Sequence, residues 1–374
     1  MSESRPAGQT ASNRESLVIC PLDYPPPDPP DSMIHLQRIN QIQPERPVML
    51  TRRRFVAWSL AAGSAAALPR FVRGGTWTAQ PAPQGLDVKQ VREGMHAILG
   101  GGGNSLVIRT GEGGILIDTK LPQVVTNLHA HVKELLGEPP AIVINTHHHG
   151  DHVGGNYAFH EQASIVGHAN IRPRLQDTID GWIRNTLRQM ASQARQNGDE
   201  AAAERLVKQA EELSLDHFAA DESYEKEHLV ERGRHRLTMR HITPGHTDND
   251  SIIHFPEHNM VHMGDLLFHR VHPFMDVGAG SNSRGWRDCL RAAIRLCDEK
   301  TIVVPGHGEI TDLAGIQSQI HYFERLEETA RQAIKDGVSR EDVRNIAIDE
   351  FASYGGGRLG ANLQAVYDEV KAAG

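Results

Sequence analysis

One short segment restricts what this chain can fold into more than any other. Residues 146–152 read THHHGDH and directly follow an apolar run, Ala141–Asn145, that is typical of a buried strand. The spacing His-x-His-x-Asp-His puts three imidazoles and a carboxylate within six residues. These are ligands that Zn²⁺ takes in catalytic sites, where one coordination position stays open for water. The segment therefore predicts the start of two neighbouring metal sites, with a histidine-rich surface loop as the alternative.

Three later segments carry further candidate ligands. They are Pro244-Gly245-His246, Met263-Gly264-Asp265 and Pro305-Gly306-His307. Each lies at or shortly after the end of a predicted strand, and glycine allows a tight backbone there. Ligands raised on strand ends converge along one edge of a sheet, where open α/β proteins place their sites. We therefore expect these residues to meet the 146–152 segment.

Composition excludes several classes of protein. The 374 residues are 39% hydrophobic and 23% charged, which is ordinary for a chain with a core and excludes wholesale disorder. A net charge of −8 provides no basic surface for nucleic acid. Of the three cysteines, Cys289 and Cys297 would lie about 12 Å apart along one predicted helix, too far for a disulfide. We expect neither a disulfide framework nor a cysteine zinc site.

The N-terminal 87 residues read as two segments outside the main domain. Residues 1–50 contain a proline-rich tract and are expected to be disordered or a mis-annotated extension. Residues 51–87 begin with Thr51-Arg52-Arg53-Arg54-Phe55 and continue into a weakly apolar stretch, which resembles a twin-arginine export signal. About a dozen apolar residues are too few for a permanent membrane span. The prediction is export by a twin-arginine translocase to the periplasm or outside; a cytoplasmic protein with a basic patch is the alternative.

The remainder is expected to form one α/β domain over 88–315 and a C-terminal helical segment over 316–374. A helical insertion at about 171–215 interrupts the domain and is a candidate for a lid or a homo-oligomer interface. Strands are predicted at 95–99, 105–109, 114–118, 141–145, 237–242, 251–255, 260–263 and 301–304, and helices at 124–136, 286–299 and from about 316.

Together, these histidines and aspartates resemble the metallo-β-lactamase fold superfamily of metallohydrolases, over roughly Val88 to Asp312. The resemblance implies a four-layered αββα sandwich with metals at the edge between its sheets. It implies one metal held by His147, His149 and His246, a second held by Asp151, His152 and His307, and Asp265 bridging both. The strand Ile115-Leu116-Ile117-Asp118 also matches, and Asp118 would support the ligand loop without binding metal.

The resemblance implies a hydrolase with two divalent cations, zinc being favoured and iron or manganese being alternatives. A metal-bridging hydroxide would attack the carbonyl carbon of a small ester, lactone, thioester or amide, and Asp151 is the best candidate for a catalytic side chain. Asp265 is similar to the bridging residue of the glyoxalase II, lactonase and phosphodiesterase branches, whereas zinc β-lactamases usually have cysteine or serine there. Histidine at position 149 differs from the glutamate of the flavodiiron branch.

Three alternatives remain at this stage: β-lactamase-type hydrolysis, an iron-dependent persulfide dioxygenase, and a non-catalytic binding protein on the same scaffold. Other side chains carry weaker predictions. His272 and Phe274 are candidate substrate contacts, with packing or surface positions equally expected. Trp182 and Met190 are candidates for a lid or for core packing. His148 is expected to face away from the ligands into solvent.

Overall fold

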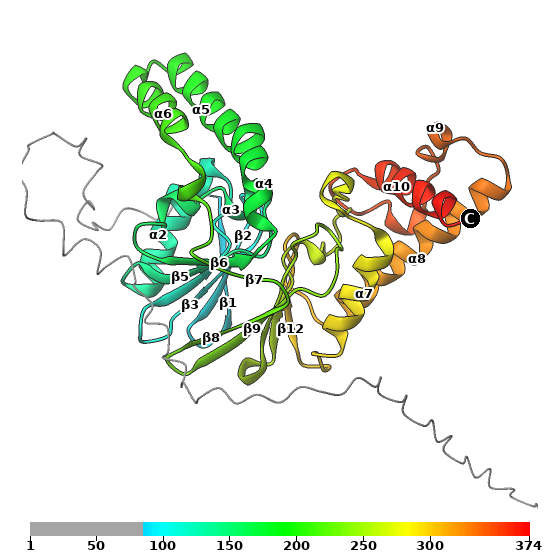
Figure 1. Cartoon of the computed structure of the whole chain (residues 1–374), viewed down its shortest axis with the longest axis horizontal. Helices are drawn as coiled ribbons and strands as arrows, with labels where there is room; N and C mark the ends of the chain where they lie inside the picture. The colour runs from blue at the N-terminus through cyan, green and yellow to red at the C-terminus, as the bar shows by residue number, and fades with distance from the viewer. Residues whose placement is uncertain (1–84) are drawn as a thin grey trace, which may run out of the picture. The chain divides into compact units, whose positions relative to one another are not determined.

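A computed structural model describes residues 85–374 (Figure 1). The predictions for residues 1–50, and all but the last residues of the predicted signal and linker at 51–87, lie outside the described residues and stay predictions. No helix in the described part of the chain is both long enough and apolar enough to cross a membrane.

The first sheet has seven strands in the order of the sequence, from β1 to β7. The first four strands pair antiparallel, whereas β4 to β7 run parallel. The strands are β1 (Asp87–Arg92), β2 (Met95–Leu99), β3 (Ser105–Ile108), β4 (Gly114–Ile117), β5 (Pro140–Ile144), β6 (Ser164–His168) and β7 (Glu222–Tyr224). The carboxyl ends of β4 and β5 therefore lie next to each other at one edge.

The second sheet has five strands in the order β12-β11-β10-β9-β8. Only β11 and β12 pair parallel. The strands are β8 (Glu227–Arg232), β9 (His235–Arg240), β10 (Ile252–Phe255), β11 (Met260–His262) and β12 (Ile302–Val304). Because β10 is antiparallel to both neighbours, β9, β11 and β12 point the same way, and the loops that follow them leave the sheet from the same edge.

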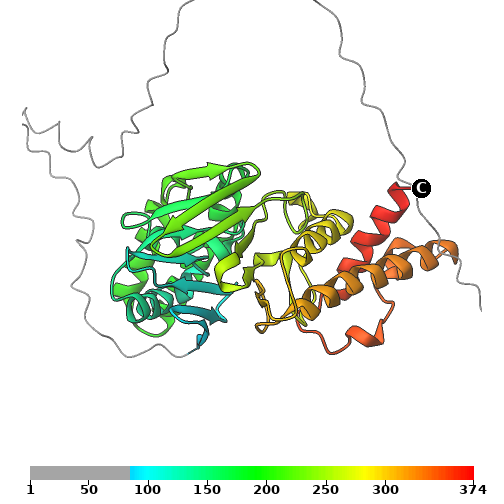
Figure 2. The same cartoon turned by 90° about the horizontal axis from the view of Figure 1, so that it is seen from below.

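The two sheets pack face to face through apolar side chains such as Leu106 and Ile144 from the first and Met239 and Phe255 from the second. Helix α2 (Val125–Leu136) covers the outer face of the first sheet. Helices α7 (Ser283–Ile294), α8 (Leu313–Lys335) and α10 (Leu359–Ala372) pack on the outer face of the second, and α8 and α10 lie side by side (Figure 2). This arrangement confirms the predicted αββα sandwich.

The insertion after β6 is helical, as predicted, and has its own small apolar core. It consists of α4 (Ile171–Thr178), a π-helical turn (Ile179–Ile183), α5 (Arg184–Gln196) and α6 (Glu200–Glu212). Helices α5 and α6 form a hairpin (Figure 1). Two further helices are single turns, α3 (Gly150–Val153) and α9 (Arg340–Val343).

The structure differs from the sequence prediction in a few elements. Strands β1, β6, β7 and β8 were not predicted. β7 has only three residues, and β8 has just two apolar residues between charged or polar ends, at a sheet edge where charges are tolerated. Helix α7 begins earlier, at Ser283, because the Asn282 side chain caps it. It ends at Ile294, so Cys297 lies beyond the helix; both described cysteines are free.

Candidate metal centre

The loop after β5 is held in place by Asp118, which follows the neighbouring parallel strand β4. The Asp118 carboxylate accepts hydrogen bonds from the backbone N–H of Thr146 at 2.9 Å and from its hydroxyl at 2.8 Å. The same carboxylate lies 2.7 Å from Nδ1 of His152. Asp118 is fully buried and has a positive φ of 57°, a conformation that aspartate tolerates better than most residues. Adjacent parallel strands thus bring a carboxylate directly behind the histidine loop.

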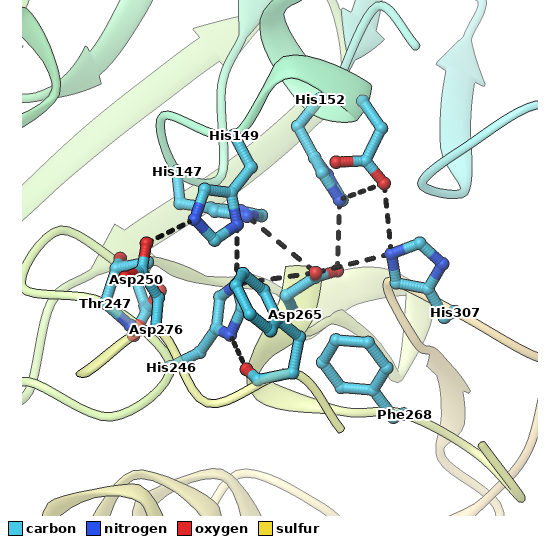
Figure 3. Close-up of polar contacts among 12 residues, drawn as sticks. His147, His149, His152, His246, Thr247, Asp250, Asp265, Phe268, Asp276 and His307 are labelled. Carbon is cyan, nitrogen blue, oxygen red and sulfur yellow. Dashed lines mark hydrogen bonds and ion pairs between the residues drawn. The ribbon is translucent and has the colours of Figure 1, made fainter. Parts of the chain in front are cut away.

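A first group gathers His147, His149, His246 and Asp265, whose ligand atoms all lie within 4.8 Å of one another (Figure 3). Nδ1 of His149 lies 2.9 Å from Nε2 of His246. Oδ2 of Asp265 lies 3.4 Å from Nε2 of His246 and 3.8 Å from Nε2 of His147. All four residues are buried. The structure therefore joins the loop after β5 to loops that follow β9 and β11.

A second group gathers Asp151, His152 and His307 beside the first. Oδ2 of Asp151 lies 3.2 Å from Nε2 of His307 and 3.7 Å from Nε2 of His152. Asp265 reaches this group as well, at 3.0 Å from Nε2 of His152 and 3.3 Å from Nε2 of His307 (Figure 3). The carboxylate of Asp265 thus lies between the two groups and contacts both.

Two of the rings are oriented by hydrogen bonds on the nitrogen that faces away from the cluster. Nδ1 of His246 lies 2.7 Å from the carbonyl oxygen of Phe274, so this nitrogen donates and Nε2 is left with its lone pair. Nε2 of His149 lies 2.9 Å from the Asp276 carboxylate. Nδ1 of the same ring therefore faces the cluster and carries the lone pair that can bind a metal. Neutral imidazole with one nitrogen so bonded is the usual form of a metal ligand.

Burial and mutual proximity shift the pKa values of the cluster strongly. Burial lowers the pKa of His246 to about 3 and holds the pKa of His147 well below its usual value. Against the effect of burial, Asp265 and Asp151 raise the pKa of His307 to about 9. Against the same effect, His307 and His152 hold the pKa of Asp265 well below its usual range. Such shifts mark groups that the fold forces together despite their desolvation.

Several buried polar atoms of the cluster have no hydrogen-bond partner. They are Nε2 of His147, Nε2 of His152 and Oδ1 of Asp265. A buried nitrogen or carboxylate oxygen without a hydrogen bond is costly, and cations held by the two groups would satisfy these atoms. Imidazole nitrogen and carboxylate oxygen are also a donor set that divalent zinc accepts. The residues therefore fit a metal centre.

A glycine-rich segment, residues 100–104, packs against this cluster and is fastened by a buried lysine. Nζ of Lys120 donates to the carbonyl oxygens of Ile98 at 2.9 Å and of Gly100 and Gly103 at 2.7 Å. A Cβ on Gly103 would lie 2.1 Å from the His152 ring, so only glycine fits. Burial lowers the pKa of Lys120 to about 7, while the three carbonyl acceptors favour the ammonium form.

The same segment also reaches the loop that carries His307. The backbone N–H of Asn104 donates to the carbonyl oxygen of Gly306 at 2.7 Å, and its side-chain amide donates to those of Pro305 and Gly308 at 2.9 Å. On the other side, the N–H of Gly103 donates to the carbonyl oxygen of Asp151 at 3.2 Å. Residues 100–104 therefore link the two loops that form the second group.

The expectation that His148 is exposed was wrong. The side chain is buried, and its Nδ1 lies 3.0 Å from the amide nitrogen of Asn249. Burial lowers the pKa of His148 to about 3. The loop is covered by the segment around Asn249 and by α4, so a side chain that points away from the cluster meets protein rather than water.

The weaker candidates fall in different surroundings. His272 is buried beside Tyr322 and Tyr354 of the C-terminal segment, with Nδ1 3.2 Å from the Tyr322 hydroxyl. The Phe274 ring lies next to His149, with centroids 5.6 Å apart. Trp182 is 47% exposed and parallel to the His149 ring at 6.2 Å, whereas Met190 packs in the core of the insertion.

Sequence reasoning missed Lys120 and Asp276 as parts of this centre. Asp276 was not among the predicted site residues, and its contact with His149 joins residues 127 positions apart. Lys120 lies two residues after Asp118, and no sequence pattern signals that a lysine will be fully buried. The one feature that could have drawn attention to Lys120 is its position among mainly apolar and small residues.

Comparisons with known proteins identify a family that matches the part of the chain carrying the cluster. Residues 98–307, which include every member of both groups, match the family model described as Metallo-beta-lactamase superfamily. A probable metallo-hydrolase, YqjP of Bacillus subtilis (strain 168), is 25% identical over 174 residues. That match covers 45% of this chain and 54% of YqjP, so the chain spans about half the length of this relative.

Solved structures similar to the chain include a metallo-beta-lactamase from Pontibacter korlensis, with 17% identity and a TM-score of 0.48, covering 64% of this chain and 99% of that one. DIM-1 metallo-beta-lactamase is 16% identical with a TM-score of 0.47, covering 64% and 98% of the two chains.

We predict that Lys120→Met lowers the free energy of unfolding by about 3 kcal/mol or more, because three buried carbonyl groups lose their donor. Urea denaturation followed by circular dichroism measures the change. Lys335→Met, at an exposed position near the end of α8, is the matched control and should change stability by less than about 0.5 kcal/mol. Equal stability of the two variants would contradict the role given to Lys120.

Proposed function

This chain belongs to the metallo-beta-lactamase superfamily, and we propose that it is a hydrolase that uses two divalent cations to hydrolyse a small carbonyl substrate. The observation that carries the proposal is the position of Asp265, whose two oxygens lie between two groups of imidazoles and contact both. One carboxylate with a histidine cluster on each side suits a pair of cations better than a single one.

We assign His147, His149 and His246 to one cation, Asp151, His152 and His307 to the other, and Asp265 to both. The mixed nitrogen and oxygen donors favour zinc, with iron or manganese as alternatives. When bound, such a pair supplies an acidified water as nucleophile and a Lewis acid for the substrate carbonyl. The chain itself then needs no serine or cysteine nucleophile.

The chain's own residues orient the site and handle the proton. Asp118, Asp276 and the Phe274 carbonyl fix the rings of His152, His149 and His246. Asp151 and His307 have the most accessible side chains of the seven, 15% and 24% exposed. Substrate therefore approaches from their side, and Asp151 is placed to take a proton from the water and deliver it to the leaving group.

The proposed substrates are esters, lactones, thioesters or amides. Aspartate at position 265 supports this choice over a β-lactam substrate on the basis of the resemblance described above. No specific contact favours persulfide oxidation or a non-catalytic binding role. The presence of all seven candidate metal ligands argues against the binding role.

Metal analysis combined with a substrate panel tests this function. We expect the purified chain to hold about two equivalents of a divalent cation and to hydrolyse a lactone or S-lactoylglutathione, whereas hydrolysis of nitrocefin alone would favour the β-lactamase alternative. A chelator should abolish hydrolysis, and added Zn²⁺ should restore it. A chain without bound metal and without hydrolysis would favour the binding role, while bound iron with persulfide-dependent oxygen uptake would favour the dioxygenase.

Asp151→Ala should reduce turnover by about 10²-fold or more, because the proton carrier at the open side of the site is lost. Turnover and metal content are measured on the same sample, so that loss of a cation is separated from loss of proton transfer. Near-normal turnover with both cations retained would exclude the catalytic role of Asp151.

Asp276→Ala should weaken cation binding by about 10–100-fold, since removal of the partner of a ligating imidazole frees the His149 ring. Competition with a fluorescent chelator gives the affinity without an activity assay. Asp276→Asn keeps an oxygen that can accept the hydrogen bond from the Ala279 N–H, as Oδ1 of Asp276 does. Its cation affinity should lie between those of Asp276→Ala and the native chain. Asp288→Ala, at an exposed position on α7, serves as the control. Native affinity in both Asp276 variants would remove this residue from the site.

A further inference from the structure

An exposed aromatic side chain lies beside His149. The large hydrophobic residues exposed in the described part of the chain are Trp182, Leu229, Ile242 and Val277. The Trp182 ring is parallel to the His149 ring, with centroids 6.2 Å apart. Val277, which is 62% exposed, directly follows in sequence the aspartate that bonds His149. Trp182 thus offers an apolar contact surface next to one member of the metal centre, and Val277 is a second candidate for that surface.

The fold holds Trp182 in this position. The residue lies in the π-helical turn Ile179–Ile183, and such turns often occur at functional sites. Helix α4, which precedes the turn, is tied to the Val277 segment through Arg174. This guanidinium pairs with both oxygens of Asp248, at 2.8 and 2.6 Å, and reaches the carbonyl oxygen of Gly278 at 3.5 Å.

A cationic side chain, that of Arg358, lies one aromatic ring away from His149. The guanidinium of Arg358 lies over the Phe274 ring, 4.5 Å from its centroid, and Phe274 in turn lies next to His149. The Arg358 side chain is exposed. Among residues 85–374, it forms no side-chain hydrogen bond or ion pair. Only one aromatic ring separates this charge from the metal centre.

The chain before Arg358 is anchored to the loop that carries Phe274. The N–H of His272 donates to the carbonyl oxygen of Gly355 at 2.8 Å, and the N–H of Gly355 donates to that of Arg270 at 3.1 Å. Beyond Arg358, the side-chain amide of Asn362 donates to the carbonyl oxygen of Pro273 at 2.8 Å. The backbone on both sides of Arg358 is thus fixed relative to Phe274.

This geometry leaves the hydrogen-bonding edge of Arg358 open. A guanidinium stacked on a ring uses its face for the contact, whereas its N–H donors point outward in its own plane. Planar donors of this kind match a carboxylate, which can accept two of them at once. The printed ring contacts run from Trp182 to His149, from His149 to Phe274 and from Phe274 to Arg358. The site therefore offers an apolar surface at Trp182 and an anion-binding group at Arg358, with His149 and Phe274 between them.

We propose that the substrate carries both an apolar, ring-bearing group, which contacts Trp182 and Val277, and a carboxylate, which Arg358 binds. This inference rests on the proposed hydrolase function and narrows its substrate class to amphiphilic anions. It assigns the insertion and the C-terminal segment to substrate selection, because Trp182 comes from the former and Arg358 from the latter.

Calorimetric titration with two matched probes tests the carboxylate part. The probes are 4-phenylbutanoate and its neutral amide, 4-phenylbutanamide, and the protein is the metal-loaded full chain. The native chain should bind the carboxylate about tenfold or more tightly than the amide. Arg358→Ala should abolish this preference, Arg358→Lys should keep part of it, and Arg295→Ala, at an exposed position after α7, should keep all of it.

A preference that survives in Arg358→Ala would show that the carboxylate binds the cations instead, and would overturn the assignment. Equal affinity of the native chain for both probes would overturn it as well. Thermal unfolding of each variant checks that the fold is intact.

The apolar part is tested with Trp182→Ala, which should weaken binding of both probes by a similar factor of about ten, because the ring contact is common to them. Trp182→Phe keeps an aromatic ring and should lose less affinity for the probes than Trp182→Ala. Unchanged affinity for both probes in Trp182→Ala would remove Trp182 from the substrate site.

The titrations do not depend on turnover, so the two proposals can fail separately. A chain that hydrolyses the lactone or S-lactoylglutathione but binds both probes equally would contradict only the amphiphilic-anion inference. A chain that shows the expected probe binding but hydrolyses nothing would contradict the hydrolase function while the binding site stands.

Discussion

The gathering of five imidazoles and two carboxylates at one point, all buried except the half-buried Asp151 and His307, is the constraint on which the rest of this structure depends. Groups of this kind lose hydration when they are buried, and the loss is tolerated only where each finds an oppositely charged partner, a hydrogen bond or a metal. The cluster meets this condition by placing Asp265 at its centre. Nε2 of His147 and Nε2 of His152 have no hydrogen bond and lie 3.8 and 3.0 Å from the Asp265 carboxylate, which is where bound cations would satisfy them.

The two sheets make this clustering possible. Strands β9, β11 and β12 run in one direction, so His246, Asp265 and His307 leave the second sheet from the same edge. The first sheet contributes β4 and β5, whose parallel carboxyl ends bring Asp118 behind the histidine loop. The apolar core between the sheets then sets the distance between the two sets of loops. Ligands from segments more than 150 residues apart meet because the sheets pack face to face.

Around the metal centre, a second set of contacts orients the candidate ligand residues and the loops that carry them. Lys120 fastens the glycine-rich segment over His152, and Asn104 connects that segment to the His307 loop. Asp276 and the Phe274 carbonyl determine which nitrogen of His149 and His246 faces inward. The substrate side is built differently, from the helical insertion and the C-terminal segment, so the superfamily's shared centre and this chain's own selectivity come from separate parts of the fold.

The amino-acid sequence by itself identified the seven cluster residues as candidates, because His-x-His-x-Asp-His and the later histidines and aspartate follow apolar runs that local sequence shows to be strands. The sandwich followed from the resemblance of these motifs to a known superfamily. The sequence did not determine the surroundings of those residues. That His148 is buried, that a lysine lies inside the protein, and that Asp276 bonds a histidine 127 positions away were decided only by tertiary structure. Burial and long-range hydrogen bonds depend on which loops pack together, and no local pattern in the chain encodes that choice.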